Sequence, residues 1–208
     1  MNDGRDRAGR AAPAPARAGR GPGWSPERAK DGAPPTMDGG EPTMDGATPA
    51  MDGVAPAAPP GTRVLLVGIG NELRHDDAAG PRVVRAVQGL VGWDTLVVHG
   101  LTPELADDLA AADLVIFVDA NADPFLPRPT WRPHAPPAQG PAAAALLGHA
   151  LTVPVLLALT SWLHGRAPRA VTLELPGYAF CIGECLTPRA AQGVATAIEA
   201  LLRLHAGC

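Results

Sequence analysis

The stretch that decides the fold is Val64-Leu-Leu-Val-Gly-Ile-Gly-Asn-Glu-Leu-Arg-His-Asp-Asp-Ala-Ala-Gly-Pro81. It opens with an unbroken apolar run over residues 64–67, which indicates a strand buried on both faces. Strands of this kind lie inside parallel sheets that are covered by helices. Glycines follow at once, and the proline at the end is typical of a first helical turn. The stretch therefore predicts a strand, a tight turn and a helix in direct succession.

The glycine turn does not fit a nucleotide site. A dinucleotide-binding turn needs a third glycine after those that would match Gly68 and Gly70, but its position holds Leu73. Asp76 and Asp77 also stand where a pyrophosphate would bind, and their negative charge would repel it. The pattern argues against NAD or ATP and favours a metal site.

The paired acids stand just ahead of the helix. Pro81 cannot donate an intrahelical hydrogen bond, so the helix is expected to begin around residues 78–80. The commonest role of an aspartate at such a place is to cap the helix. Of two adjacent acids, we expect one to cap, and we take Asp77 as the one left free for chemistry.

The rest of the chain predicts alternating strands and helices, with strands around residues 95–98, 114–118 and 170–175, helical faces over 83–90 and 105–109, and an edge strand around 130–132. A threonine ahead of a proline predicts three more helix starts, at Thr102, Thr152 and Thr187, and glycines predict two helix ends, at Gly165 and Gly207. This order predicts a single α/β domain of three layers, a twisted, mostly parallel sheet with helices on both faces.

Two further residues are candidates for chemistry. Asp119 ends an apolar strand, so it should project from a rigid element into the crevice beyond the carboxyl ends of the strands, where Asp77 also lies. The alternative is that Asp119 only starts a turn over residues 119–123. His149 precedes the expected helix start at Thr152 and could add a nitrogen to the two carboxylates around a divalent cation, although a loop histidine is more often an ordinary surface residue. His75 and His99 also lie near the crevice.

The cysteines are a weak metal signal. Cys181 and Cys185 are four residues apart, with neither further cysteines nor a histidine placed as in zinc sites, so small reduced thiols are the simpler interpretation. An odd number of cysteines, with Cys208, also argues against a disulfide framework. The motifs of serine hydrolases, zincins and P-loop enzymes do not occur in the sequence.

Residues 1–60 differ from the rest because Ala, Gly, Pro and Arg dominate them, and we expect them to be a disordered extension. They contain a seven-residue repeat that starts at Pro35, Pro42 and Pro49. The domain is therefore expected over 61–208. With 17 Lys and Arg against 21 Asp and Glu, the chain lacks the charge of a nucleic-acid binder. No apolar run suggests a membrane span or a secretory signal, so we expect a cytoplasmic monomer.

At this point the chain resembles a known family, the hydrogenase maturation endopeptidases, over residues 63–205. The resemblance rests on residues in a fixed order: Val67-Gly-Ile-Gly-Asn-Glu-Leu-Arg-His-Asp-Asp-Ala-Ala-Gly80, Leu101-Thr-Pro-Glu-Leu-Ala106, Val115-Ile-Phe-Val-Asp-Ala120, His149 before a leucine-rich helix, and Leu175-Pro-Gly-Tyr-Ala-Phe-Cys-Ile-Gly-Glu-Cys-Leu-Thr-Pro188. Two departures stand out: Gly148 precedes His149 where many members have a serine nearby, and the extension has no counterpart.

The resemblance implies a function. Members of this family trim the C-terminus of the large subunit of nickel-iron hydrogenase after nickel has been installed. Carried over residue by residue, their metal-contacting acids and histidine become Asp77, Asp119 and His149, which act as both catalytic and metal residues. The implied nickel arrives with the precursor and need not be a resident cofactor. Either the metal or a carboxylate could then activate water. A nickel-dependent checkpoint or chaperone that binds the same precursor without cutting it is the alternative.

Overall fold

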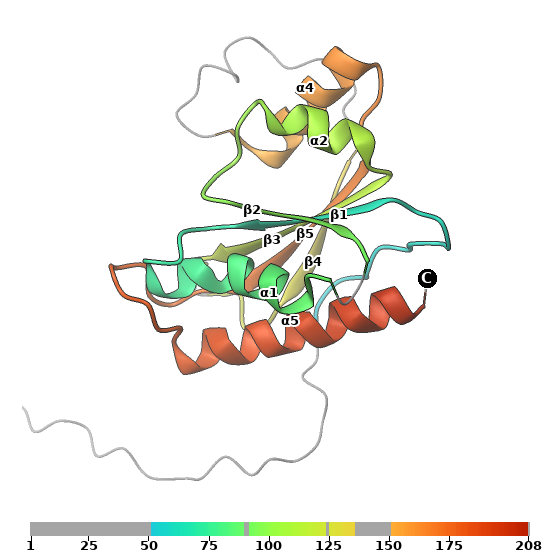
Figure 1. Cartoon of the computed structure of the whole chain (residues 1–208). Coiled ribbons are helices and arrows are strands. Elements are labelled where there is room, and N and C mark those ends of the chain that lie inside the picture. The colour runs from blue at the N-terminus through green and yellow to red at the C-terminus, as the bar shows by residue number, and fades with distance from the viewer. Residues whose placement is uncertain (1–50, 90–91, 124, 136–150, 208) are drawn as a thin grey trace, which may run out of the picture. The chain divides into compact units, whose positions relative to one another are not determined.

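The computed structural model describes residues 51–89, 92–123, 125–135 and 151–207. The described chain forms one five-stranded sheet in the order β2-β1-β3-β5-β4, with helices on both faces (Figure 1). The strands are β1 Val64–Ile69, β2 Asp94–Val98, β3 Leu114–Asn121, β4 Thr130–His134 and β5 Arg169–Pro176. Four of them run parallel, and β4 pairs antiparallel with β5 at the edge. The predicted α/β architecture and the edge strand are confirmed.

The helices form the two outer layers. A 3-10 turn, His75–Ala78, leads into α1, Ala79–Val87, and the other helices are α2 Leu105–Ala111, α4 Val153–His164 and α5 Pro188–Ala206. Helices α1 and α5 cover one face of the sheet, and α2 and α4 cover the other (Figure 1). These positions agree with the periodicities in the sequence, including the helix that starts just after the paired acids.

The central strand, β3, explains why the sheet needs helices on both sides. In β3, Ile116 and Val118 pack against the α1 and α5 layer, while Val115 and Phe117 pack against the α2 and α4 layer. All four side chains are buried. Burial of one such side chain stabilises a fold by about 1.5–3 kcal/mol, so an uncovered face would cost several such contributions.

Most of the predicted helix ends are confirmed. Thr152 and Thr187 precede α4 and α5, and Gly165, in the left-handed conformation at φ 70°, ends α4. The prediction for Thr102 is wrong, because α2 begins only at Leu105, after Glu104. The N–H of Leu105 donates to the Thr102 carbonyl at 3.2 Å, so residues 102–105 form a tighter turn that leads into the helix.

The domain starts earlier than the expected boundary between residues 60 and 61. Asp52 exchanges backbone hydrogen bonds with both Pro129 and Trp131, at 3.1 and 3.0 Å, beside β4. Ala58 is only 7% exposed. Composition gave the wrong boundary because backbone hydrogen bonds to a sheet edge do not require apolar side chains. Residues 1–50, including the first two repeats, lie outside the described residues. Within the described part of the chain, no helix is long and apolar enough to cross a membrane.

Candidate active site

A glycine turn brings the first acid to the end of the sheet. Gly70 follows β1 with φ at 139°, and a Cβ there would collide with the backbone carbonyl of Asp77. Its N–H donates to the Val98 carbonyl at 2.9 Å, which ties the turn to β2. Gly80 lets α1 approach equally closely, because a Cβ there would meet the carbonyl oxygens of Ile69 and Val118. The two glycines therefore fix the position of the segment that carries Asp77.

Asp77 is half-buried in the 3-10 turn. Its Oδ2 accepts a hydrogen bond from the N–H of Asn71 at 3.0 Å, which orients the carboxylate. Its Oδ1 makes no hydrogen bond with the described residues, so one oxygen remains available for a ligand. The sequence does not show that Asn71 orients Asp77, because the group that donates is the backbone N–H, which every residue except proline has.

Asp119 lies near the carboxyl end of β3, half-buried. Burial is the main cause that raises the pKa of its carboxyl to about 6; the negative charges of Asp77 and Glu174 add to it, and the hydrogen bond from the Ala120 N–H opposes it. Glu174 stands directly beside Asp119 in the register of β3 and β5, and Arg132 holds it with hydrogen bonds of 2.6 and 2.8 Å. Asp119 is therefore a carboxyl group that can gain or lose a proton near neutral pH.

A cavity of about 460 Å³ opens beside Asp119. It lies where the sequence predicted a crevice, at the carboxyl ends of the first three parallel strands and the start of α4, and is lined by Ile69, Gly100, Leu101, Asp119, Leu151, Thr152, Val153 and Thr172. Its size is that of sites that hold a small ligand or a few residues of a peptide. Asp77 lies at this end of the sheet too, because its carbonyl is packed against Gly70 at the end of β1 and Gly80 is packed against the carbonyl oxygens of Ile69 and Val118.

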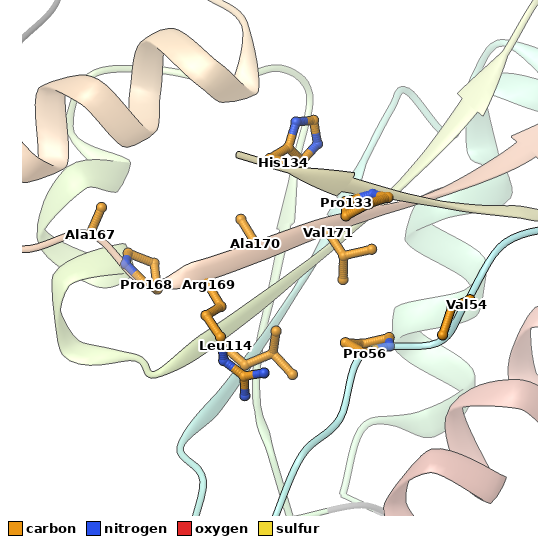
Figure 2. A pocket seen from close by; sticks show the side chains of 10 residues that line it. All are labelled: Val54, Pro56, Leu114, Pro133, His134, Ala167, Pro168, Arg169, Ala170 and Val171. Carbon is orange, nitrogen blue, oxygen red and sulfur yellow. The ribbon is translucent and has the colours of Figure 1, made fainter. Parts of the chain in front are cut away.

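A second cavity, of about 490 Å³, lies at the opposite end of the strands (Figure 2). Pro133 and Val171 line it together with Val54 and Pro56 from the N-terminal segment. Its histidine, His134, is engaged by the Thr172 hydroxyl at 2.8 Å. None of the described residues that line this cavity is a carboxylate, so the crevice beside Asp119 is the better candidate for chemistry although it is slightly smaller.

Asp76 has a different role from the one expected. Neither acid of the pair caps the 3-10 turn or α1 with its side chain, so the capping prediction is wrong. Asp76 is fully buried at 0% exposure and accepts hydrogen bonds from the N–H groups of Tyr178, Ala179 and Thr187 and from the Thr187 hydroxyl, at 2.7–3.1 Å. Burial alone would raise its pKa, but these hydrogen bonds outweigh it and lower the pKa. The carboxylate therefore binds backbone N–H groups of the segment 177–187 and does not cap the helix.

The histidine and cysteine candidates lie in different surroundings. His149 lies outside the described residues, so its part in the site stays a prediction. His75 lies against Gly183, with its Nδ1 2.6 Å from the Cys185 carbonyl oxygen, and so fastens the same loop. Cys181 and Cys185 are exposed free thiols. Among the described residues, no cluster of three or more histidines, cysteines and acids could hold a metal ion.

The fold has counterparts among solved structures. No family model matches the chain, and no curated protein matches it. Two solved hydrogenase maturation proteases share its fold. The hydrogenase 2 maturation peptidase of Thaumarchaeota archaeon SCGC_AB-539-E09 is 20% identical, with a TM-score of 0.51 over 70% of this chain and 99% of that one. The [NiFe] hydrogenase maturation protease HycI of Thermococcus kodakarensis KOD1 is 22% identical, with a TM-score of 0.51 over 70% and 93%.

Proposed function

We propose that this protein is an endopeptidase that removes a C-terminal peptide from the nickel-loaded large subunit of a nickel-iron hydrogenase. The observation that carries the proposal is the position of Asp77 and Asp119 just beyond β1 and near the carboxyl end of β3, on a fold shared with solved maturation proteases. The motifs in the sequence support the same activity. The substrate would be the large-subunit precursor, and the reaction would take place in the cytoplasm.

The two carboxylates would have different roles in the cleavage. Asp77 is oriented by the Asn71 N–H and keeps one oxygen for the nickel that the precursor carries. Asp119, with its pKa raised to about 6, would accept a proton from the attacking water. Water oxygen then adds to the scissile carbonyl carbon, the C–N bond breaks, and the proton passes to the leaving amine. Either carboxylate is a suitable oxygen ligand for nickel, and His149 would add a nitrogen.

The nickel in this scheme belongs to the substrate. Two carboxylates and one imidazole would leave coordination positions open for groups of the precursor, as catalytic metal sites do. The protein would then recognise only a precursor that already holds its metal. This requirement makes the cleavage a checkpoint for metal insertion.

The test uses the full-length protein and the large-subunit precursor in nickel-loaded and nickel-free forms. The mass of the precursor is measured before and after incubation. We expect a short C-terminal peptide to be lost only from the nickel-loaded form. The variants Asp77→Ala and Asp119→Ala should abolish the cleavage while the fold is retained, and Asp94→Ala, an exposed acid on β2, serves as the matched control.

The competing function is a nickel-dependent checkpoint or chaperone that binds the precursor without cutting it. The same two acids favour it, because they could hold the nickel of the precursor without supplying a base. This function predicts a stable complex with the nickel-loaded precursor and an unchanged mass. That outcome would replace the endopeptidase assignment.

A further inference from the structure

Two exposed apolar residues lie on adjacent, hydrogen-bonded loops at the same end of the sheet as the candidate site. Leu73, in the turn between β1 and the paired acids, is 61% exposed, and Ile182, in the loop after β5, is 89% exposed. The N–H of Gly183 donates to the Leu73 carbonyl at 2.9 Å, and the N–H of His75 donates back to the Gly183 carbonyl at 2.6 Å. This short ladder joins the two loops. We call Leu73 and Ile182 the apolar rim.

The loops that carry the apolar rim are held firmly. The buried Asp76 carboxylate binds backbone N–H groups near both ends of the loop 177–187, and the Arg74 guanidinium donates to the Phe180 carbonyl at 3.0 and 3.1 Å. Arg82 also donates to the Glu184 carbonyl. A surface fixed in advance loses little conformational entropy when a partner binds. One buried carboxylate and two exposed guanidinium groups thus hold a loop in which Ile182 is exposed.

The position of the apolar rim relative to the acids indicates its partner. Leu73 is separated from Asp77 by three residues, within the turn whose Asn71 N–H orients the Asp77 carboxylate. A protein that delivers a peptide bond to Asp77 meets the turn that carries Leu73, because that turn also holds the Asn71 N–H bound to the Asp77 carboxylate. Exposed apolar groups beside a polar site are typical of protein–protein contacts. Two carboxylates alone offer too small a surface to select a protein substrate.

We propose that the apolar rim is the docking surface for the protein substrate, and that it takes an apolar patch on the folded precursor beside the segment that is cut. This inference rests on the proposed function for the identity of the substrate. It assigns the selection of the substrate to Leu73 and Ile182 and leaves the bond cleavage to the two acids. Substitutions in the rim should therefore weaken binding without slowing the chemical step.

The test compares the full-length protein with the variants Leu73→Ser, Ile182→Ser and the double variant. The dissociation constant for the nickel-loaded precursor is measured by calorimetry, and kcat and KM are measured from the appearance of the cut precursor. Each exposed apolar group that becomes buried in an interface contributes enough for about a tenfold change, so the double variant should raise Kd and KM by about 10- to 100-fold with kcat within about twofold. The matched control is Leu163→Ser, near the C-terminal end of α4, where the leucine is similarly exposed at 53%.

The outcomes separate this inference from the proposed function. A double variant that binds and cuts the precursor as the parent does would overturn the docking surface, and so would an equal loss in Leu163→Ser. If the parent protein binds the precursor but does not cut it, the proposed endopeptidase activity is contradicted. The apolar rim is still tested in that case, because the change in Kd between the parent and the variants does not depend on cleavage. Circular dichroism and thermal unfolding of each variant show whether a loss reflects unfolding, and the single variants repeat the test with a smaller change.

Discussion

The substitution Asp119→Asn should make the protein more stable at neutral pH. Burial raises the pKa of the Asp119 carboxyl from 3.8 to about 6, so the folded protein binds this proton more tightly than the unfolded chain does. Below pH 4 the carboxyl is protonated in both states and costs nothing. As the pH rises from about 4 to about 6, the unfolded chain ionises first, and stability is lost. The loss is complete and constant only well above pH 6, where the carboxyl is ionised in both states.

The size of the effect follows from the shift in pKa. Two pKa units correspond to about 3 kcal/mol, which is the ceiling for the gain from a neutral amide of the same shape. The open side of the cavity lets solvent screen the charge, and the amide weakens the hydrogen bond from the Ala120 N–H. We therefore expect Asp119→Asn to raise the free energy of unfolding by about 1–2 kcal/mol at pH 7.5. The gain should vanish near pH 4.

Urea denaturation of the full-length protein at pH 4.5 and pH 7.5 measures this effect. Asp94→Asn is the control, since this exposed acid begins β2, and it should change the free energy of unfolding equally at both pH values. The reasoning about Asp119 is refuted by a variant that is no more stable than the parent at pH 7.5, or whose gain is the same at both pH values. A confirmed gain would show that the site holds an acid at the expense of stability, which is common where function fixes a residue.

Three further substitutions test the structure around the site. Asp77→Asn should lower the pKa of Asp119 below about 6, because one of the negative charges that raise it is removed; carbon NMR of the Asp119 carboxyl across pH measures this, and an unchanged titration would contradict the coupling. Asp76→Ala should lower the free energy of unfolding by about 3–5 kcal/mol in urea denaturation, because it leaves buried N–H groups without a partner. A loss below 1 kcal/mol would show that water replaces the carboxylate. Gly70→Ala should cost at least about 2 kcal/mol in the same measurement, because of its positive φ and the close Asp77 carbonyl, and a neutral effect would contradict that contact.

Much of the architecture follows from the spacing of apolar residues and from the residues that start or end helices and strands. The apolar runs gave β1 and β3, and glycine, proline and threonine marked the starts and ends of α4 and α5. These signals work because they are local: each reflects which backbone conformation or burial a few residues prefer. The edge strand β4 was also predictable, since a proline such as Pro133 is tolerated only where a strand lacks a second neighbour along most of its length.

The site was predictable only in part. Asp77 and Asp119 were expected at one crevice because parallel strands end at the same edge of a sheet. The roles of Glu174 and Asp76 depend on tertiary contacts that no local pattern encodes. Glu174 acts through the register of β3 and β5, and Asp76 acts through N–H groups about a hundred residues away in the chain. Composition failed at residues 51–60 for the same reason, because the edge of β4 supplies their hydrogen bonds.

The contact between Asp52 and the outer side of β4 has a consequence for how the protein behaves in a crowded solution. An edge strand with unpaired N–H and C=O groups is a template on which a strand of another molecule can form, and this is a common route to aggregation. Asp52 takes up the Trp131 N–H and the Pro129 carbonyl, and Gly53, with φ at 80°, turns the segment where a Cβ would collide with the Trp131 carbonyl. A stretch with the composition of a linker thus pairs with part of the edge on which such a strand could form.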